Sequence, residues 1–193
     1  MKRIISVILA AMMLLMIAPT AAHGKRAESR APYGYVEHEY DQLLAFMEQT
    51  NSAGVKNGTQ LSSAYDPNDP ETWGGIFWYI APTGFIHAEY IFFSTYDFPN
   101  RNLVGTLNLS GFSKLRAFGC AGNSITAVSI SDCPLLDELN VAQNLLTNFS
   151  VSNCAELRLV WCEENMLPSV SMSNLPKLRQ LHCYQNPITE LDV

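Results

Sequence analysis

Side chains that could carry chemistry are scattered along this chain and do not form a known catalytic pattern. The 193 residues include 5 cysteines, 4 histidines and 18 acidic residues. The sequence lacks G-x-S-x-G, H-E-x-x-H and a glycine-rich phosphate loop, the patterns typical of serine hydrolases, zinc proteases and nucleotide-binding enzymes. The adjacent carboxylates of Glu163 and Glu164 would point to opposite sides of a strand. We therefore expect a protein that is not an enzyme and has no cofactor and no metal site.

The cysteines are spaced in a way that indicates a structural role. Cys133 and Cys154 are separated by an interval of 21, and so are Cys162 and Cys183. An odd total of five, with Cys120, does not suit a full set of disulfides. Buried thiols behave as small hydrophobic side chains. We therefore expect all five to be reduced and buried; a disulfide within either of these two pairs is the alternative.

Four asparagines, each flanked by apolar residues, repeat at the same interval of 21: Asn123, Asn144, Asn165 and Asn186. Blocks of this length, starting at 114, 135, 156 and 177, place the apolar side chains in columns. Two of these columns are Leu115, Leu136, Leu157, Leu178 and Phe118, Leu139, Val160, Leu181. A fixed period of this length indicates a solenoid, in which stacked coils join the columns into a continuous core.

Each block begins with alternating residues that predict a short strand. Stacked blocks would pair these strands into a parallel sheet, and the chain must turn sharply after each strand. Such a turn leaves backbone groups without partners inside the coil, and a buried asparagine amide offers both donors and an acceptor to them. This is the structural role that we predict for the four asparagines.

The repeat L-x-x-L-x-C/V-x-x-N-x-L, which covers about 102–193, resembles the leucine-rich repeat signature. Cysteine in the third apolar column is similar to the bacterial, internalin-like branch of that family. The resemblance implies an α/β fold: a right-handed solenoid with a parallel β-sheet on its concave face and little regular helix on its convex side. It also implies adhesion or contact with a host.

Residues 1–22 have the form of a secretory signal peptide. Lys2 and Arg3 precede a short apolar run that leads to small residues ending at Ala22. The run is shorter than the ~20 residues of a membrane-spanning helix. We expect cleavage after Ala22, secretion or a cell-surface location, and no membrane span afterwards; a membrane anchor is the alternative. The net charge of −6 disfavours nucleic acid as a partner.

The segment between the signal peptide and the repeats has two parts. Residues 23–35 are polar and irregular and predict a flexible tether. Residues 36–93 predict an N-terminal cap with a first strand and an amphipathic helix, in which Tyr40, Leu43, Leu44 and Met47 share one face. "DQLLAFM" followed by "WGGIFW" resembles the N-terminal cap of plant-type leucine-rich repeat proteins, without its paired cysteines. The repeats then occupy 94–193, and the last one is incomplete.

The last two blocks carry the residues that we predict to bind a ligand. Between the buried columns, strand alternation turns side chains outward to the concave face. The predicted ligand-binding residues are Arg158, Leu159, Trp161, Glu163, Arg179, His182 and Tyr184. Large aromatic side chains on a solvated sheet face are typical of binding hot spots, although cross-strand packing of aromatic neighbours is an alternative explanation.

The sequence thus predicts a non-catalytic, exported protein that binds another protein through the concave face. Glycan or cell-wall binding, with aromatic rings stacked on sugars, is the first alternative. A structural spacer within a larger surface protein is the second. The final apolar column residues lack a polar covering segment, so end-to-end self-association or continuation of the repeats is also expected.

Overall fold

The structure is a computed structural model that describes residues 31–93 and 102–192. The predicted signal peptide with its cleavage after Ala22 and most of the 23–35 tether lie outside this range, as does Val193. Within it, no helix is both long enough and apolar enough to cross a membrane.

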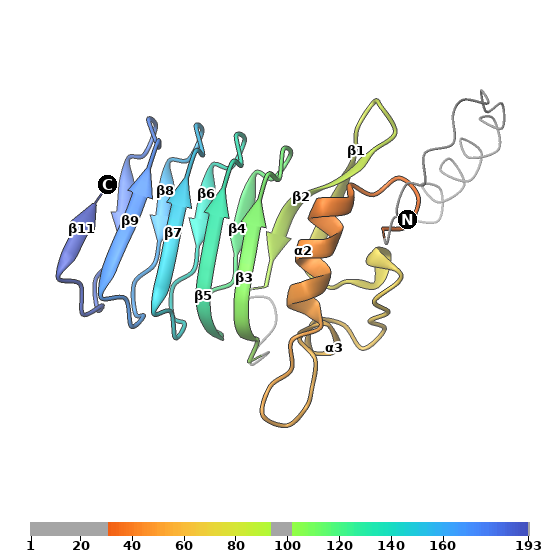
Figure 1. Ribbon diagram of the computed structural model, residues 1–193, viewed down its shortest axis with the longest axis horizontal. Coiled ribbons are helices and arrows are strands. Elements are labelled where there is room, and N and C mark those ends of the chain that lie inside the picture. The colour runs from red at the N-terminus through yellow and green to blue at the C-terminus, as the bar shows by residue number, and fades with distance from the viewer. Residues whose placement is uncertain (1–30, 94–101, 193) are drawn as a thin grey trace, which may run out of the picture.

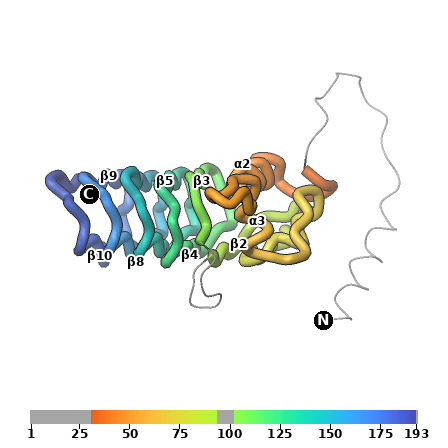
Figure 2. The backbone as a smooth tube through the Cα atoms, turned by 90° about the horizontal axis from the view of Figure 1, so that it is seen from below, coloured from red at the N-terminus to blue at the C-terminus, as the bar shows by residue number. Residues whose placement is uncertain are grey.

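The 21-residue blocks form a β-solenoid with two parallel sheets facing each other across the core (Figures 1 and 2). The strands that open the blocks lie in one sheet: β4 (Ala117–Gly119), β6 (Glu138–Asn140), β8 (Leu159–Trp161) and β10 (Gln180–His182). The opposite sheet holds β3 (Val104–Ser110), β5 (Ser124–Ser131), β7 (Asn148–Ser152), β9 (Ser169–Ser173) and β11 (Glu190–Asp192).

This second sheet was not predicted. We expected only that this side of the solenoid would contain little regular helix. The reason lies in segments such as Ser124–Ser131, where apolar and small polar residues alternate. Val128 and Ile130 face the core and are each 1% exposed, while Ser129 is exposed. This period of two suits a strand that is buried on one face only, and each coil therefore contributes a strand to both sheets.

The core consists of the predicted columns, paired in register from coil to coil. Phe118 pairs with Leu139, Leu139 with Val160, and Val160 with Leu181. The first three of these are at most 1% exposed, whereas Leu181 is only partly buried. Burial decreases toward β11, where Leu191 is 52% exposed, because no described coil covers that side.

The N-terminal region, residues 31–93, contains the predicted amphipathic helix. Helix α2 (Glu37–Met47) is followed by α3 (Asn57–Leu61), a 3₁₀ turn η1 (Pro70–Thr72) and the hairpin of β1 (Ile76–Ile80) and β2 (Ile86–Phe92). Strand β2 pairs in parallel with β4, so the hairpin extends the first sheet to six strands. Of the two tryptophans in "WGGIFW", Trp73 is buried and stacks on Tyr40 at 5.1 Å, and Trp78 is partly buried.

Helix α2 and the start of α3 cover the outer edge of β3 (Figure 1). Three side-chain amides each accept from a backbone N–H of β3 and donate to the carbonyl of the same residue. These pairs are Gln42 with Ser110, Gln49 with Thr106, and Asn57 with Val104. The amides thereby reproduce the hydrogen bonds that a neighbouring strand would make.

Candidate functional site

The structure gathers the predicted ligand-binding residues onto two adjacent strands of the six-stranded sheet. Leu159 and Trp161 belong to β8, and His182 belongs to β10 directly opposite Trp161. Glu163 and Tyr184 follow these strands, whereas Arg158 and Arg179 precede them. We call the outer surface formed by Leu159, Trp161, Glu163, His182 and Tyr184 the β8–β10 face.

Aromatic side chains dominate this face. The rings of Trp161 and His182 stack with centroids 5.9 Å apart and planes at 17°. Both are half-buried, while Tyr184 is 57% exposed. Stacking covers part of one face of the Trp161 ring. On its other side stands Asn140, which is in register on β6 and is much smaller than an indole.

Negative charge lies at the end of the face where the strands stop. One oxygen of Glu163, Oε2, is buried and has no hydrogen-bond partner among the described residues. The pKa of Tyr184 is raised above its ordinary value, first by partial removal of solvent and then by the charges of Glu163 and Glu164. The phenol therefore stays protonated at neutral pH and can donate a hydrogen bond.

Positive charge lies at the opposite end, before the strands, where most of it is neutralised. Arg158 donates to both carboxylate oxygens of Asp137, and this contact lowers the pKa of Asp137. Lys177 contacts Glu156 at 2.7 Å. Arg179 makes no ion pair with any described residue. The two ends of β8 and β10 thus carry opposite charges.

A second aromatic group, which was not predicted from the sequence, lies on the same sheet. Phe77 of β1 and Phe92 of β2 are 58% and 37% exposed and meet at 6.2 Å, and Tyr90 stacks beside Phe92 at 6.2 Å. A Cβ atom on Gly119 would lie 3.4 Å from the Phe92 ring, an ordinary van der Waals contact, so the glycine lies directly beside that ring. Alternation within "FIHAEYIFFS" was the signal, but this strand lies before the first registered block.

The four predicted structural asparagines line the turn after each strand of this sheet. Asn144 accepts from Ile125 N–H at 3.1 Å and donates to the carbonyls of Cys120, Val141 and Ala142 at 3.0–3.2 Å. Asn123, Asn165 and Asn186 repeat this set on their own coils. Several carbonyls serve two asparagines: that of Cys120 accepts from Asn123 as well as from Asn144. The amides therefore form a continuous ladder that holds this edge of the sheet in register.

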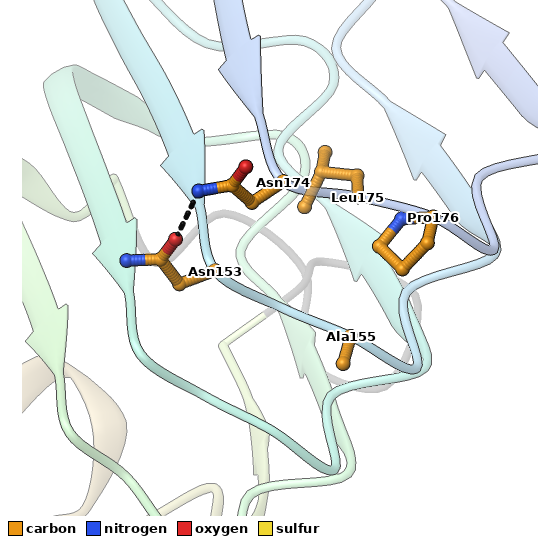
Figure 3. Close-up of a pocket in the computed structure, with 5 residues that line it drawn as sticks. All are labelled: Asn153, Ala155, Asn174, Leu175 and Pro176. Carbon is orange, nitrogen blue, oxygen red and sulfur yellow. Dashed lines mark hydrogen bonds between the residues drawn. The ribbon is translucent and has the colours of Figure 1, made fainter.

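A shallow pocket lies on the other turn of the coils (Figure 3). Asn174 Nδ2 donates to Asn153 Oδ1 at 2.7 Å, and Ala155, Leu175 and Pro176 form the rest of the lining. Asn153 and Asn174 both have a left-handed backbone with φ of 55°, a conformation that asparagine tolerates well. The lining has no charged or nucleophilic side chain, so this pocket does not support catalysis.

All five cysteines are free thiols in the structure. Four are fully buried, and Cys183 on the last coil is partly buried. Burial raises the pKa of Cys162 to about 12, so this thiol is not a nucleophile at neutral pH. In 31–93 and 102–192, no three His, Cys, Asp or Glu side chains lie close enough together to hold a metal ion.

Comparison with protein-family models, with curated proteins and with solved structures yields no match to the chain. The resemblance to leucine-rich repeats therefore rests on the 21-residue motif itself. The geometry of the site itself indicates its chemistry: partly exposed aromatic rings, a carboxylate with no hydrogen-bond partner among the described residues and a phenol that can donate.

Proposed function

We propose that this chain is a non-catalytic binding protein that recognises another protein through the β8–β10 face. The observation that carries the proposal is the partly exposed aromatic group of Trp161, His182 and Tyr184 on the outside of a rigid sheet. Aromatic side chains of this kind dominate the energetics of protein interfaces. The strands fix their positions, so little conformational freedom is lost when a partner binds.

Stacking within the site favours a protein over a glycan. Sugar rings bind to the open faces of aromatic rings, but Trp161 and His182 cover each other in part. A glycan remains the second candidate because Tyr184 and Phe77 are each more than half exposed on the same sheet. A structural spacer would leave all of these rings without a ligand.

We further propose that the protein is an exported leucine-rich repeat protein of the internalin-like type, with residues 36–93 as its N-terminal cap. The signal-like segment 1–22, the 21-residue repeat and the β-solenoid support this proposal. The cap is supported by the way in which α2 occupies the edge of β3. Adhesion is the role that fits such a protein.

The test compares the native protein with Trp161→Ala and with the control Tyr33→Ala, whose ring is 92% exposed in the N-terminal region. Each is immobilised and exposed to cell-surface extracts, and captured proteins are quantified, purified and titrated directly. Loss of Trp161 should weaken a partner's binding by about 2 kcal/mol or roughly thirtyfold, while the control binds normally. A glycan array with the same three proteins tests the second candidate. Capture that is identical for all three would refute the proposed site.

A further inference from the structure

Some of the carboxylates on and beside the β8–β10 face are not paired with any cation of the described residues. The structure shows ion pairs with lysine or arginine for these acidic residues: Glu48, Glu89, Asp137 and Glu156. No described cation pairs with Glu138, Glu163 or Glu164. Glu138 and Glu163 lie on or beside the outer surface of β6 and β8, so a partner would meet their charge directly.

Glu163 is the carboxylate best placed to receive a donor. Its Oε2 is buried without a partner, and its Oε1 accepts no hydrogen bond from a described residue. Glu163 as a whole is only partly buried, so a ligand can reach the carboxylate at Oε1 and supply a hydrogen bond there. Tyr184 aligns with Glu163 on the next coil and is 57% exposed, which places an accessible aromatic ring beside the carboxylate.

We propose that the β8–β10 face recognises a basic side chain of its protein partner, an arginine before a lysine. The guanidinium would pair with the Glu163 carboxylate and lie against the Tyr184 ring. Arginine suits this arrangement because its planar group combines a charge-assisted hydrogen bond to a carboxylate with stacking on an aromatic ring. This inference rests on the function proposed above and adds the chemistry of the partner.

Arg179 determines how such a partner is oriented. It lies at the other end of β10 and has no ion pair among the described residues, so it repels a second cation there. The partner's basic group is therefore directed to the Glu163 end. An acidic group on the same partner would be favoured at the Arg179 end.

The test follows the indole N–H signals of the three tryptophans by NMR during titration with a short peptide. The probes are acetyl-Gly-Arg-Gly-Arg-Gly-amide and the same peptide with citrulline, a neutral isostere of arginine. Trp161→Phe identifies the Trp161 signal. Trp73 and Trp78 donate to backbone carbonyls of Asp66 and Pro70 in the N-terminal region, so their signals report that the fold is intact.

We expect the arginine peptide to shift the Trp161 signal saturably and the citrulline peptide to bind at least about tenfold more weakly. Glu163→Gln should weaken arginine binding by a similar factor. The control Glu190→Gln removes the same charge from β11 in the other sheet and should change binding by less than about twofold. Added salt should weaken the binding.

If Glu163→Gln and Glu190→Gln weakened the binding of the arginine peptide equally, the binding would be non-specific electrostatic attraction, and the inference would be overturned. Equal affinities of the arginine and citrulline peptides would overturn it as well. No response to arginine, together with capture of a protein that depends on Trp161, would overturn this inference and leave the proposed function standing. Failure of both experiments would refute both.

Discussion

Replacement of Asn144 by alanine tests the amide ladder, on which the register of the solenoid depends. Asn144 is 5% exposed and makes four hydrogen bonds to backbone groups of its own coil and the preceding one. If the four hydrogen bonds were independent and contributed about 1 kcal/mol each, the substitution would lower the free energy of unfolding by about 4 kcal/mol.

The structure predicts a smaller loss because most of these bonds are shared. The three carbonyls served by Asn144 each keep a second donor: Asn123 Nδ2, Asn165 Nδ2 or Gly122 N–H. Only Ile125 N–H is left without its acceptor. One buried orphan donor costs about 1–3 kcal/mol, and the small cavity adds to it, so we expect a loss of about 2–3 kcal/mol.

The measurement is urea unfolding followed by circular dichroism, with Asn148→Ala as the matched control. Asn148 undergoes the same substitution but is exposed on β7, so its loss should stay within about 0.5 kcal/mol. A loss for Asn144→Ala no larger than that of the control would refute the buried role of the ladder. A loss well above the roughly 4 kcal/mol of four independent bonds would refute the argument from shared carbonyls.

The variant Asn144→Asp adds a test by pH. A carboxylate can accept from Ile125 N–H but cannot donate to the three carbonyls, so burial and these carbonyls raise its pKa above the ordinary value of about 3.9. A raised pKa means that this variant is most stable relative to the native protein below pH ~3.9, and that this contribution to stability is lost as the pH rises through the folded-state value. A stability difference from the native protein that does not vary with pH would contradict this reasoning.

Three further predictions concern the core and the face. Thiol labelling of the native protein should modify the partly buried Cys183 first and Cys162 much more slowly, whereas five thiols should react after denaturation; rapid labelling of Cys162 would contradict its burial. Trp161→Ala should lower the stability by about 1 kcal/mol, since the ring is half-buried and stacked; a melting experiment showing a far larger loss would make this residue structural. Leu139→Ala should cost about 2–5 kcal/mol and Leu181→Ala clearly less, because Leu181 is only partly buried.

The repeat made much of the solenoid predictable. Columns such as Phe118, Leu139 and Val160 are buried because in-register strands place equivalent residues on top of one another. The second sheet was not predicted, since the family resemblance directs attention to one strand per coil. Its alternating serines, such as Ser129 and Ser131, were present in the sequence as a strand signal.

The candidate site was predictable in part. Alternation places Trp161 on the outside whenever Val160 and Cys162 are inside, and the structure agrees. The stacking of Trp161 on His182 depends on side-chain rotamers, which the repeat does not specify. The pairing of Arg158 with Asp137 links two coils, and it emerges only when charged residues are aligned by column as carefully as the apolar ones.

Because the asparagine ladder joins only adjacent coils, the length of the solenoid can change in steps of one whole repeat. Every contact of Asn144 or Asn165 is with its own coil or the one before it, so inserting or deleting one whole 21-residue block would leave all remaining registers intact. A change of this kind between β2 and β8 would alter the separation of the Phe92 and Trp161 aromatic groups by one strand spacing, about 4.8 Å. In-frame duplication or loss of a repeat could thus adjust the span between the two groups in fixed steps, without redesign of either.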